Sequence, residues 1–214
     1  MAFDYNAPAI KRPPYRAKLY LSAPESQTLY DLTQNDFQQR TTDWINFRRL
    51  NSRALPIVYR RALLDHGSLT ARLIKASNHN FSVSLLSQVW SRASLSESRL
   101  LNVRPQHRCM IREVLLRCNN QPWVYARSVL PAKTLRGKLG HLRRLGNKPL
   151  GQLLFSTPNM RRDEFELAFA PAGVLCEHPA VANYCKLEQA IWGRRSRFEL
   201  YQKPLIVSEI FLPA

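Results

Sequence analysis

Residues 109–116, CMIREVLL, and residues 123–130, WVYARSVL, lie on either side of the turn sequence NNQP at 119–122. Two runs rich in apolar, β-branched and aromatic residues around such a turn predict an antiparallel β-hairpin. Alternate side chains of a strand share a face, so Arg112 is predicted to lie in a row of aliphatic side chains. Burying a guanidinium there is costly unless it meets an anion. Either a protein carboxylate, such as that of Glu113, or the carboxylate of a bound ligand would supply that anion.

A second arginine, Arg127, repeats this pattern on the partner strand. It shares a predicted face with Trp123, Tyr125 and Val129. Two interpretations are open. Arg127 either lies in a pocket together with Arg112, or lies on a solvated face with its aliphatic stem against the aromatic side chains.

The last apolar run, residues 205–212 (LIVSEIFL), contains one acidic residue, Glu209. Both faces of this run are apolar, which predicts a central strand covered on both sides and paired in a hairpin with residues 196–200. Glu209 is therefore predicted to be buried. A buried carboxylate forms an ion pair, becomes protonated or takes part in chemistry. Arg112 or Arg127 is the candidate partner for an ion pair.

Two predicted helix starts add hydrogen-bond donors. The sequence predicts helix over residues 56–76 with a break near residue 67, after which Ser68 is a plausible N-cap and Leu69 opens the second part. Proline suits a first helical position, so a helix is also predicted from Pro149, with the N–H groups of Leu150 and Gly151 among its free donors. Helix N-termini bind carboxylates and phosphates readily.

The chain is strongly basic, with 32 Lys and Arg against 15 Asp and Glu and a net charge of +17. This charge alone would allow nucleic-acid binding. The sequence has no zinc-finger spacing, RNP-like motif or convincing helix-turn-helix, so a specific nucleic-acid partner is not expected. A cationic protein also attracts a dianionic substrate and anionic membrane surfaces.

The remaining composition features predict one reduced, metal-free domain. Its 214 residues, 45% of them hydrophobic, are enough for a single full core. The four cysteines form two pairs nine residues apart rather than C-x-x-C motifs, and the five histidines are scattered. The N-terminus lacks a secretory signal pattern, so a cytoplasmic protein is expected.

An ordered set of motifs resembles the chorismate lyase family, whose members make 4-hydroxybenzoate for ubiquinone. The resemblance implies an α+β fold with a single antiparallel β-sheet, helices packed on one side of it, and a ligand pocket buried between them. The matching pieces run in the family's order: GSLTAR at 67–72, IREVLL at 111–116, QPW through SVLP at 121–131, LG with KPLG at 145–151, WGRRSR at 192–197, KPL at 203–205 and EIFLPA at 209–214.

The same resemblance implies a substrate-binding set. Arg112 is similar to the family's carboxylate-binding arginine, and the backbone N–H groups at Leu69 and Leu150 would assist it, with Gly151 beside them. The family often has methionine where this chain has Leu69. Because that contact is made through the backbone, the difference has little consequence.

The resemblance also implies two catalytic residues and a reaction. Glu209 is similar to the glutamate that contacts the ring hydroxyl, and Arg127 resembles a second pocket arginine on the enolpyruvyl side. The implied reaction converts chorismate to 4-hydroxybenzoate and pyruvate, the first committed step toward the ubiquinone ring. Aromatisation drives it, so no metal, nucleotide or redox cofactor is expected.

Two segments depart from the family pattern. Residues 1–50 form an N-terminal extension, partly loose, in which the apolar patches at 29–32 and 44–47 are predicted to dock as short helices on the lyase-like domain, residues 51–214. An insertion at about 167–190 is interpreted as a lid or a surface excursion.

The expected ligands are chorismate and 4-hydroxybenzoate, and the chain is expected to be a monomer with a possible peripheral contact to a membrane or a downstream enzyme. The main alternative is a non-catalytic sensor of an aromatic acid with the same fold. Such a sensor would carry a DNA-binding helical domain, and the first 50 residues show no clean three-helix pattern. A lyase-derived protein that only binds is a third alternative.

Overall fold

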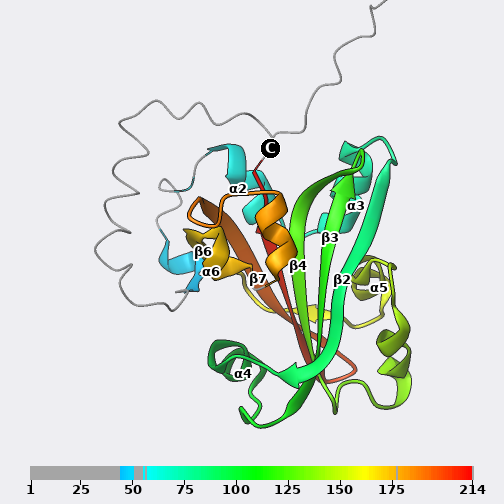
Figure 1. Ribbon diagram of the computed structural model, residues 1–214. Coiled ribbons are helices and arrows are strands. Elements are labelled where there is room, and N and C mark those ends of the chain that lie inside the picture. The colour runs from blue at the N-terminus through cyan, green and yellow to red at the C-terminus, as the bar shows by residue number, and fades with distance from the viewer. Residues whose placement is uncertain (1–43, 51–54, 56, 177, 214) are drawn as a thin grey trace, which may run out of the picture.

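The computed structural model describes residues 44–50, 55, 57–176 and 178–213. One antiparallel sheet forms the centre of this part of the chain, in the order β1-β6-β7-β8-β4-β3-β2, with β5 paired to β7 (Figure 1). The predicted α+β class and single antiparallel sheet are confirmed. The strands are β1 (Ile45–Asn46), β2 (Phe81–Arg92), β3 (Arg108–Cys118), β4 (Gln121–Pro131), β5 (Arg161–Arg162), β6 (Glu166–Pro171), β7 (Ala190–Leu200) and β8 (Lys203–Phe211).

Both predicted hairpins are present. In the β3–β4 turn, Asn119 and Asn120 have φ of 50° and 60°. Asparagine tolerates this left-handed conformation better than most residues, which explains the tight turn. The β7–β8 hairpin turns at Tyr201 and Gln202. Strand β8 lies between β7 and β4, so it is central, as its apolar faces predict.

The two faces of the sheet carry different side chains. The cavity face bears Arg112, Val114, Ala126, Ser128 and Glu209, and the back face bears Glu113, Leu115, Tyr125, Arg127 and Ile210. Because β-strand side chains alternate, each strand contributes to both sets.

Helices cover both faces. On the cavity face lie α2 (Ile57–Leu63), α3 (Leu69–Ala76), α5 (Leu150–Ser156) and the 3-10 helix η4 (Gly137–Arg144). On the back face lie α4 (Leu95–Leu101), α6 (Ala172–Leu175) and η5 (Pro179–Asn183). The helices around the predicted pocket are thus on one side, but the expectation that all helices share that side is corrected by α4 and α6.

The predicted insertion at 167–190 begins within strand β6, and the part after β6 packs on the back face. Leu175, Val181 and Cys185 are buried there against Leu115 and Tyr125. None of its described residues lines the cavity on the other side of the sheet. The lid interpretation of this segment is therefore wrong for this conformation.

The chain before residue 51 contributes to the sheet. Residues 44–47, predicted as a short helix, instead form β1 and begin the 3-10 helix η2 (Phe47–Arg49), and β1 pairs with β6. Trp44 packs against the back-face cluster and lies near the Arg195 guanidinium. The patch at 29–32 lies outside the described residues. No helix in the described part of the chain is long and apolar enough to cross a membrane.

Candidate active site

A cavity lies between the cavity face of the sheet and the N-termini of α3 and α5. Its floor consists of two neighbouring cross-strand rows. The first row contains Val114, Ala126 and Glu209 and continues to Arg194 beyond the cavity lining, and the second contains Arg112, Ser128 and Val207 and continues to Ser196 beyond the lining. In the middle of the floor, Ala126 and Ser128 have small side chains that extend little into the cavity. The charged groups at the two ends of the floor are therefore separated by small side chains.

Arg112 lies at one end of the floor and is only 1% exposed. Its Nη2 donates to the carbonyl oxygens of Gly146 and Lys148, both at 2.9 Å, and its buried Nε has no partner in the described structure. No carboxylate among the described residues lies within ion-pair distance of it. Burial lowers the pKa of Arg112 to about 10, so it remains a cation at neutral pH. A buried cation without an anion calls for an anionic ligand.

The two helix N-termini meet beside Arg112. Leu69 and Thr70 open α3, Leu150 and Gly151 open α5, and all four line the cavity. The first N–H groups of a helix have no partner within it, so these are donors for an anion. A Cβ on Gly151 would lie 2.6 Å from the Oγ1 of Thr70, so only glycine allows this close approach.

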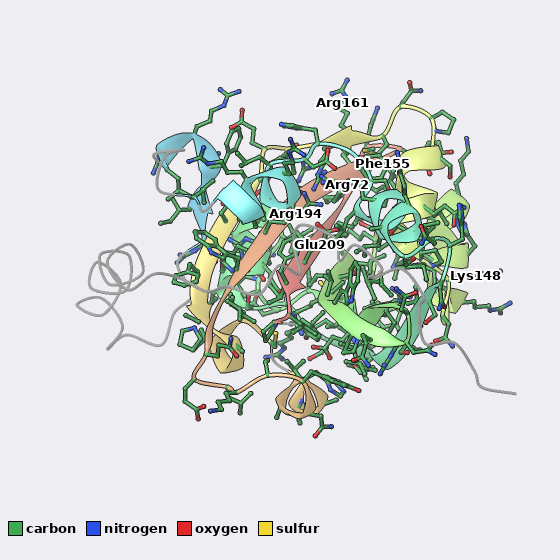
Figure 2. The ribbon with its side chains drawn as sticks, turned by 90° about the horizontal axis from the view of Figure 1, so that it is seen from above. Arg72, Lys148, Phe155, Arg161, Arg194 and Glu209 are labelled. Carbon is green, nitrogen blue, oxygen red and sulfur yellow. The ribbon has the colours of Figure 1, made fainter. Side chains whose placement is uncertain are left out.

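Glu209 lies farther along the floor, in β8. Its Oε2 accepts a hydrogen bond of 2.5 Å from the Nε of Arg194, which faces it from β7. Within the described residues no hydrogen bond reaches its other oxygen, Oε1. Figure 2 shows Glu209 and Arg194 close together near the middle of the molecule. The carboxylate is thus held by one oxygen and available through the other.

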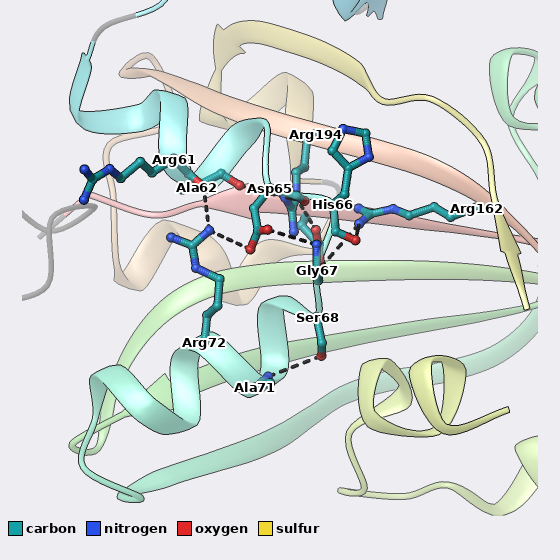
Figure 3. Close-up of polar contacts among 11 residues, drawn as sticks. Arg61, Ala62, Asp65, His66, Gly67, Ser68, Ala71, Arg72, Arg162 and Arg194 are labelled. Atoms are coloured by element: carbon teal, nitrogen blue, oxygen red, sulfur yellow. Dashed lines mark hydrogen bonds and ion pairs between the residues drawn. The ribbon is translucent and has the colours of Figure 1, made fainter.

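Arg194 also fixes the turn between α2 and α3. It is 1% exposed, and its Nη1 donates to the carbonyl oxygens of Ala62 (2.7 Å) and Asp65 (2.9 Å). Arg72 binds the Asp65 carboxylate at 2.6 Å, and the N–H of Gly67 donates to the same side chain (Figure 3). Burial opposes ionisation of Asp65, but these donors lower its pKa overall. The turn is therefore held rigidly where it starts α3 at the cavity.

Arg127 does not reach the cavity. It lies on the back face and is 7% exposed, with its Nε 2.9 Å from Glu97 and its Nη1 3.3 Å from Glu113. Burial opposes ionisation of both glutamates, but hydrogen bonds and the Arg127 charge lower the pKa of each. Arg127, which was expected to be a second pocket arginine, thus belongs to a structural ion-pair network on the back face. The ion-pair partner of Glu209 is neither Arg112 nor Arg127 but Arg194.

A β-bulge accounts for the misplacement of Arg127. Cys118 pairs with Gln121 at the turn, but the register shifts by one residue at Leu116. An unbroken register would place Arg127 opposite Arg112, whereas the observed one places it opposite Glu113. A shift of one residue exchanges the two faces of a strand.

Sequence reasoning missed two arginines. Arg194 belongs to the WGRRSR motif but was given no role. Its pairing with Glu209 follows from the unbroken β7–β8 register counted back from the turn. Arg162, in the short strand β5, also lines the cavity, and no local signal in the sequence distinguishes it from its neighbour Arg161.

The fold and the site together define a class of protein, an α+β protein whose internal cavity contains a buried arginine with no carboxylate partner among the described residues. The chorismate lyase family model matches residues 37–214, and the chain belongs to that family. A probable chorismate pyruvate-lyase from Methylococcus capsulatus is 41% identical over 154 residues, which cover 71% of this chain and 93% of the relative. A protein of the same name from Pseudomonas putida is 37% identical over 186 residues, 86% of each chain. Among solved structures, PhnF from Mycobacterium smegmatis aligns with a TM-score of 0.49 at 15% identity, over 69% of this chain and 65% of that one.

Proposed function

We propose that this chain converts chorismate to 4-hydroxybenzoate and pyruvate, and so supplies the ring of ubiquinone. One observation carries the proposal. Among the described residues, Arg112 is buried without a carboxylate partner, and Glu209 has only one of its two oxygens in a hydrogen bond. Both lie on one cavity floor, separated by small side chains. A ring with an acid at one end and a hydroxyl at the other complements this arrangement.

In the proposed complex, the ring carboxylate binds Arg112 at its free N–H side. The N–H groups of Leu69, Leu150 and Gly151 lie at helix N-termini beside it and provide further donors. The hydrophobic side chains of Val114 and other lining residues exclude water, which strengthens these charged hydrogen bonds. The carboxylate is thereby fixed before the chemical step.

The reaction breaks the ether bond between the ring and the enolpyruvyl oxygen. The electron pair of that bond leaves with pyruvate enolate, the ring carbon that bears the hydroxyl loses its proton, and the ring becomes aromatic. The enolate gains a proton at its methylene carbon and becomes pyruvate. In our proposal, Glu209 hydrogen-bonds the ring hydroxyl through Oε1 and assists proton transfer, while Arg194 holds Oε2. Arg194 thus acts as a positioning residue.

Two further assignments belong to this proposal. The described residues of one chain supply both helix N-termini and both charged ends of the proposed site, so the function proposed here needs no second subunit, and we propose a monomer. The net charge of +17 favours attraction of a dianion from the cytoplasm, where we place the reaction. Sedimentation of the purified chain tests the first assignment.

The deciding experiment mixes the purified chain with chorismate, without added metal or cofactor, and follows pyruvate and 4-hydroxybenzoate together. Equimolar appearance of both is the expected result. Tight binding of 4-hydroxybenzoate without turnover would instead assign the chain to the sensors of aromatic acids. If the chain neither converted chorismate nor bound 4-hydroxybenzoate, its resemblance to the family would be one of fold alone.

A further inference from the structure

We infer that Arg162 forms a second anion subsite in the same cavity, which takes the carboxylate of the enolpyruvyl side chain and of the leaving pyruvate enolate. This inference rests on the proposed function and extends it. Chorismate has two carboxylates, and Arg112 meets only one of them. Arg127 was the predicted partner of the second, but it lies on the other face of the sheet with Glu97 and Glu113.

Neutral groups hold the Arg162 side chain in place. Its Nε donates to the Oγ of Ser196 at 3.0 Å, and its Nη1 lies 3.2 Å from the carbonyl oxygen of His66 and 3.4 Å from that of Gly67. The guanidinium carbon lies 4.3 Å from the ring centroid of Phe165. The arginine is thus positioned without using its charge on a protein anion.

The charge of Arg162 is uncompensated at short range. In the residues that the structure describes, no carboxylate comes within ion-pair distance of it. Burial and the nearby Arg194 lower the pKa of Arg162 to about 10, while Glu209 and Asp65 act in the opposite direction. It is therefore a cation at neutral pH, as Arg112 is, and both line the cavity.

The position of Arg162 matches the shape of chorismate. Its anchor Ser196 is at the opposite end of the floor row from Arg112, three strand spacings or roughly 14 Å away. The enolpyruvyl ether and the hydroxyl are on neighbouring ring carbons, and the ring carboxylate is on the far side. The second carboxylate subsite must therefore lie near Glu209 and away from Arg112. Arg162, which couples electrostatically to Glu209, meets both requirements.

This placement gives Arg162 a role in the chemical step. As the ether bond breaks, the enolpyruvyl fragment gains negative charge, and a cation already in position stabilises that charge without reorganisation. The product 4-hydroxybenzoate retains only the ring carboxylate. Arg162 should therefore matter for chorismate but not for 4-hydroxybenzoate, whereas Arg112 should matter for both.

The test compares Arg162→Gln with Arg161→Gln, a matched control one residue away on the exposed side of the same strand. For each variant, kcat/KM is measured with chorismate, and the Kd of 4-hydroxybenzoate is measured by calorimetry. We expect Arg162→Gln to lower kcat/KM about 30-fold or more. The Kd of the product should stay within about twofold of the wild-type value. Arg161→Gln should change neither quantity, and Arg162→Lys should recover part of the lost kcat/KM.

Two results would overturn the inference. Unchanged kcat/KM in Arg162→Gln would remove Arg162 from the reaction. An equal loss of kcat/KM and product affinity would show that Arg162 only holds the α2–α3 turn, because that turn positions Leu69 for the ring carboxylate. Absence of product from the wild-type chain is a different outcome, which would overturn the proposed function itself.

Discussion

Arg112 and Arg127 lie on adjacent strands of one sheet, and both are almost fully buried. They lie on opposite faces of that sheet, and their surroundings differ. Arg127 meets two glutamates, Glu97 and Glu113, on the back face. Arg112 meets two carbonyl oxygens and no carboxylate of the described chain on the cavity face. Burial alone therefore does not identify a binding arginine. A binding arginine is identified by burial together with the absence of a nearby protein carboxylate, because a buried cation that lacks such a partner needs an anionic ligand.

The first prediction compares one glutamate from each face. Glu209→Gln should lower kcat for chorismate about 10²- to 10⁴-fold, because it removes the group proposed to assist proton transfer. Binding of 4-hydroxybenzoate should remain measurable by calorimetry. Glu113→Gln on the back face is the control and should leave kcat per folded molecule unchanged. Full activity of Glu209→Gln would remove its catalytic role.

The second prediction concerns the stability that the back face provides. Arg127→Met should lower the free energy of unfolding by about 3–5 kcal/mol, because it leaves two buried carboxylates without their cation. Urea titration followed by circular dichroism measures this change. A loss below about 1 kcal/mol, the range of an exposed ion pair, would contradict the structural role.

The same network makes a prediction about pH. The pKa values of Glu97 and Glu113 are lower in the folded chain, so the folded state binds fewer protons than the unfolded state. Their contribution to stability is present above the unfolded pKa of about 4.3 and is lost as the pH falls through the folded values. Urea titrations from pH 6 to 3 should show this loss in the wild type. In Arg127→Met the dependence should be weaker, and an equally steep dependence would count against the network.

The third prediction tests the helix N-termini on the cavity face. In Gly151→Ala the new Cβ would lie 2.6 Å from Thr70 Oγ1, so either the Thr70 side chain must rotate or α3 and α5 must move apart, and both change the junction of the two helix N-termini. The affinity for 4-hydroxybenzoate should fall about 10- to 100-fold, in line with the 1–3 kcal/mol that overpacking costs. Gly140→Ala is the matched control, because its Cβ would meet only the Leu135 oxygen at 3.7 Å. Equal affinities in the two variants would contradict the proposed contact.

The fourth and smallest effect is expected for the stability of Arg112→Met without ligand. The variant loses the hydrogen bonds to Gly146 and Lys148 but no longer buries a cation that lacks an anion. The free energy of unfolding should therefore stay within about 1 kcal/mol of the wild-type value. If Arg112→Met lost as much free energy of unfolding as Arg127→Met, both arginines would be structural, and the contrast between them would be wrong.

The sequence predicts most of the cavity face. The two hairpins, the starts of α3 and α5, and the anomalous positions of Arg112 and Glu209 all follow from local patterns, because strand alternation and helix capping act over a few residues. The register of β7 and β8 could also have been counted from their turn, and it would have paired Arg194 with Glu209.

The remaining features depend on non-local structure. The bulge at Trp123, opposite Leu116 and Arg117, turns Arg127 to the back face and has no unambiguous signal in the sequence. Arg162 reaches the cavity from a two-residue strand whose pairing with β7 is set by tertiary packing. Similarly, the part of the 167–190 segment that follows β6 covers the back face because its apolar residues meet Leu115 and Tyr125 there, and nothing in the segment itself specifies that face.

The central claim is that Arg112, and not Arg127, binds the carboxylate of the ligand. Calorimetric titration of 4-hydroxybenzoate into Arg112→Met and Arg127→Met, under conditions where both are folded, tests it most directly. The structure predicts that the first variant loses about 30-fold or more in affinity. The second should stay within about twofold of the wild type. Wild-type affinity in Arg112→Met, or an equal loss in both variants, would contradict the claim.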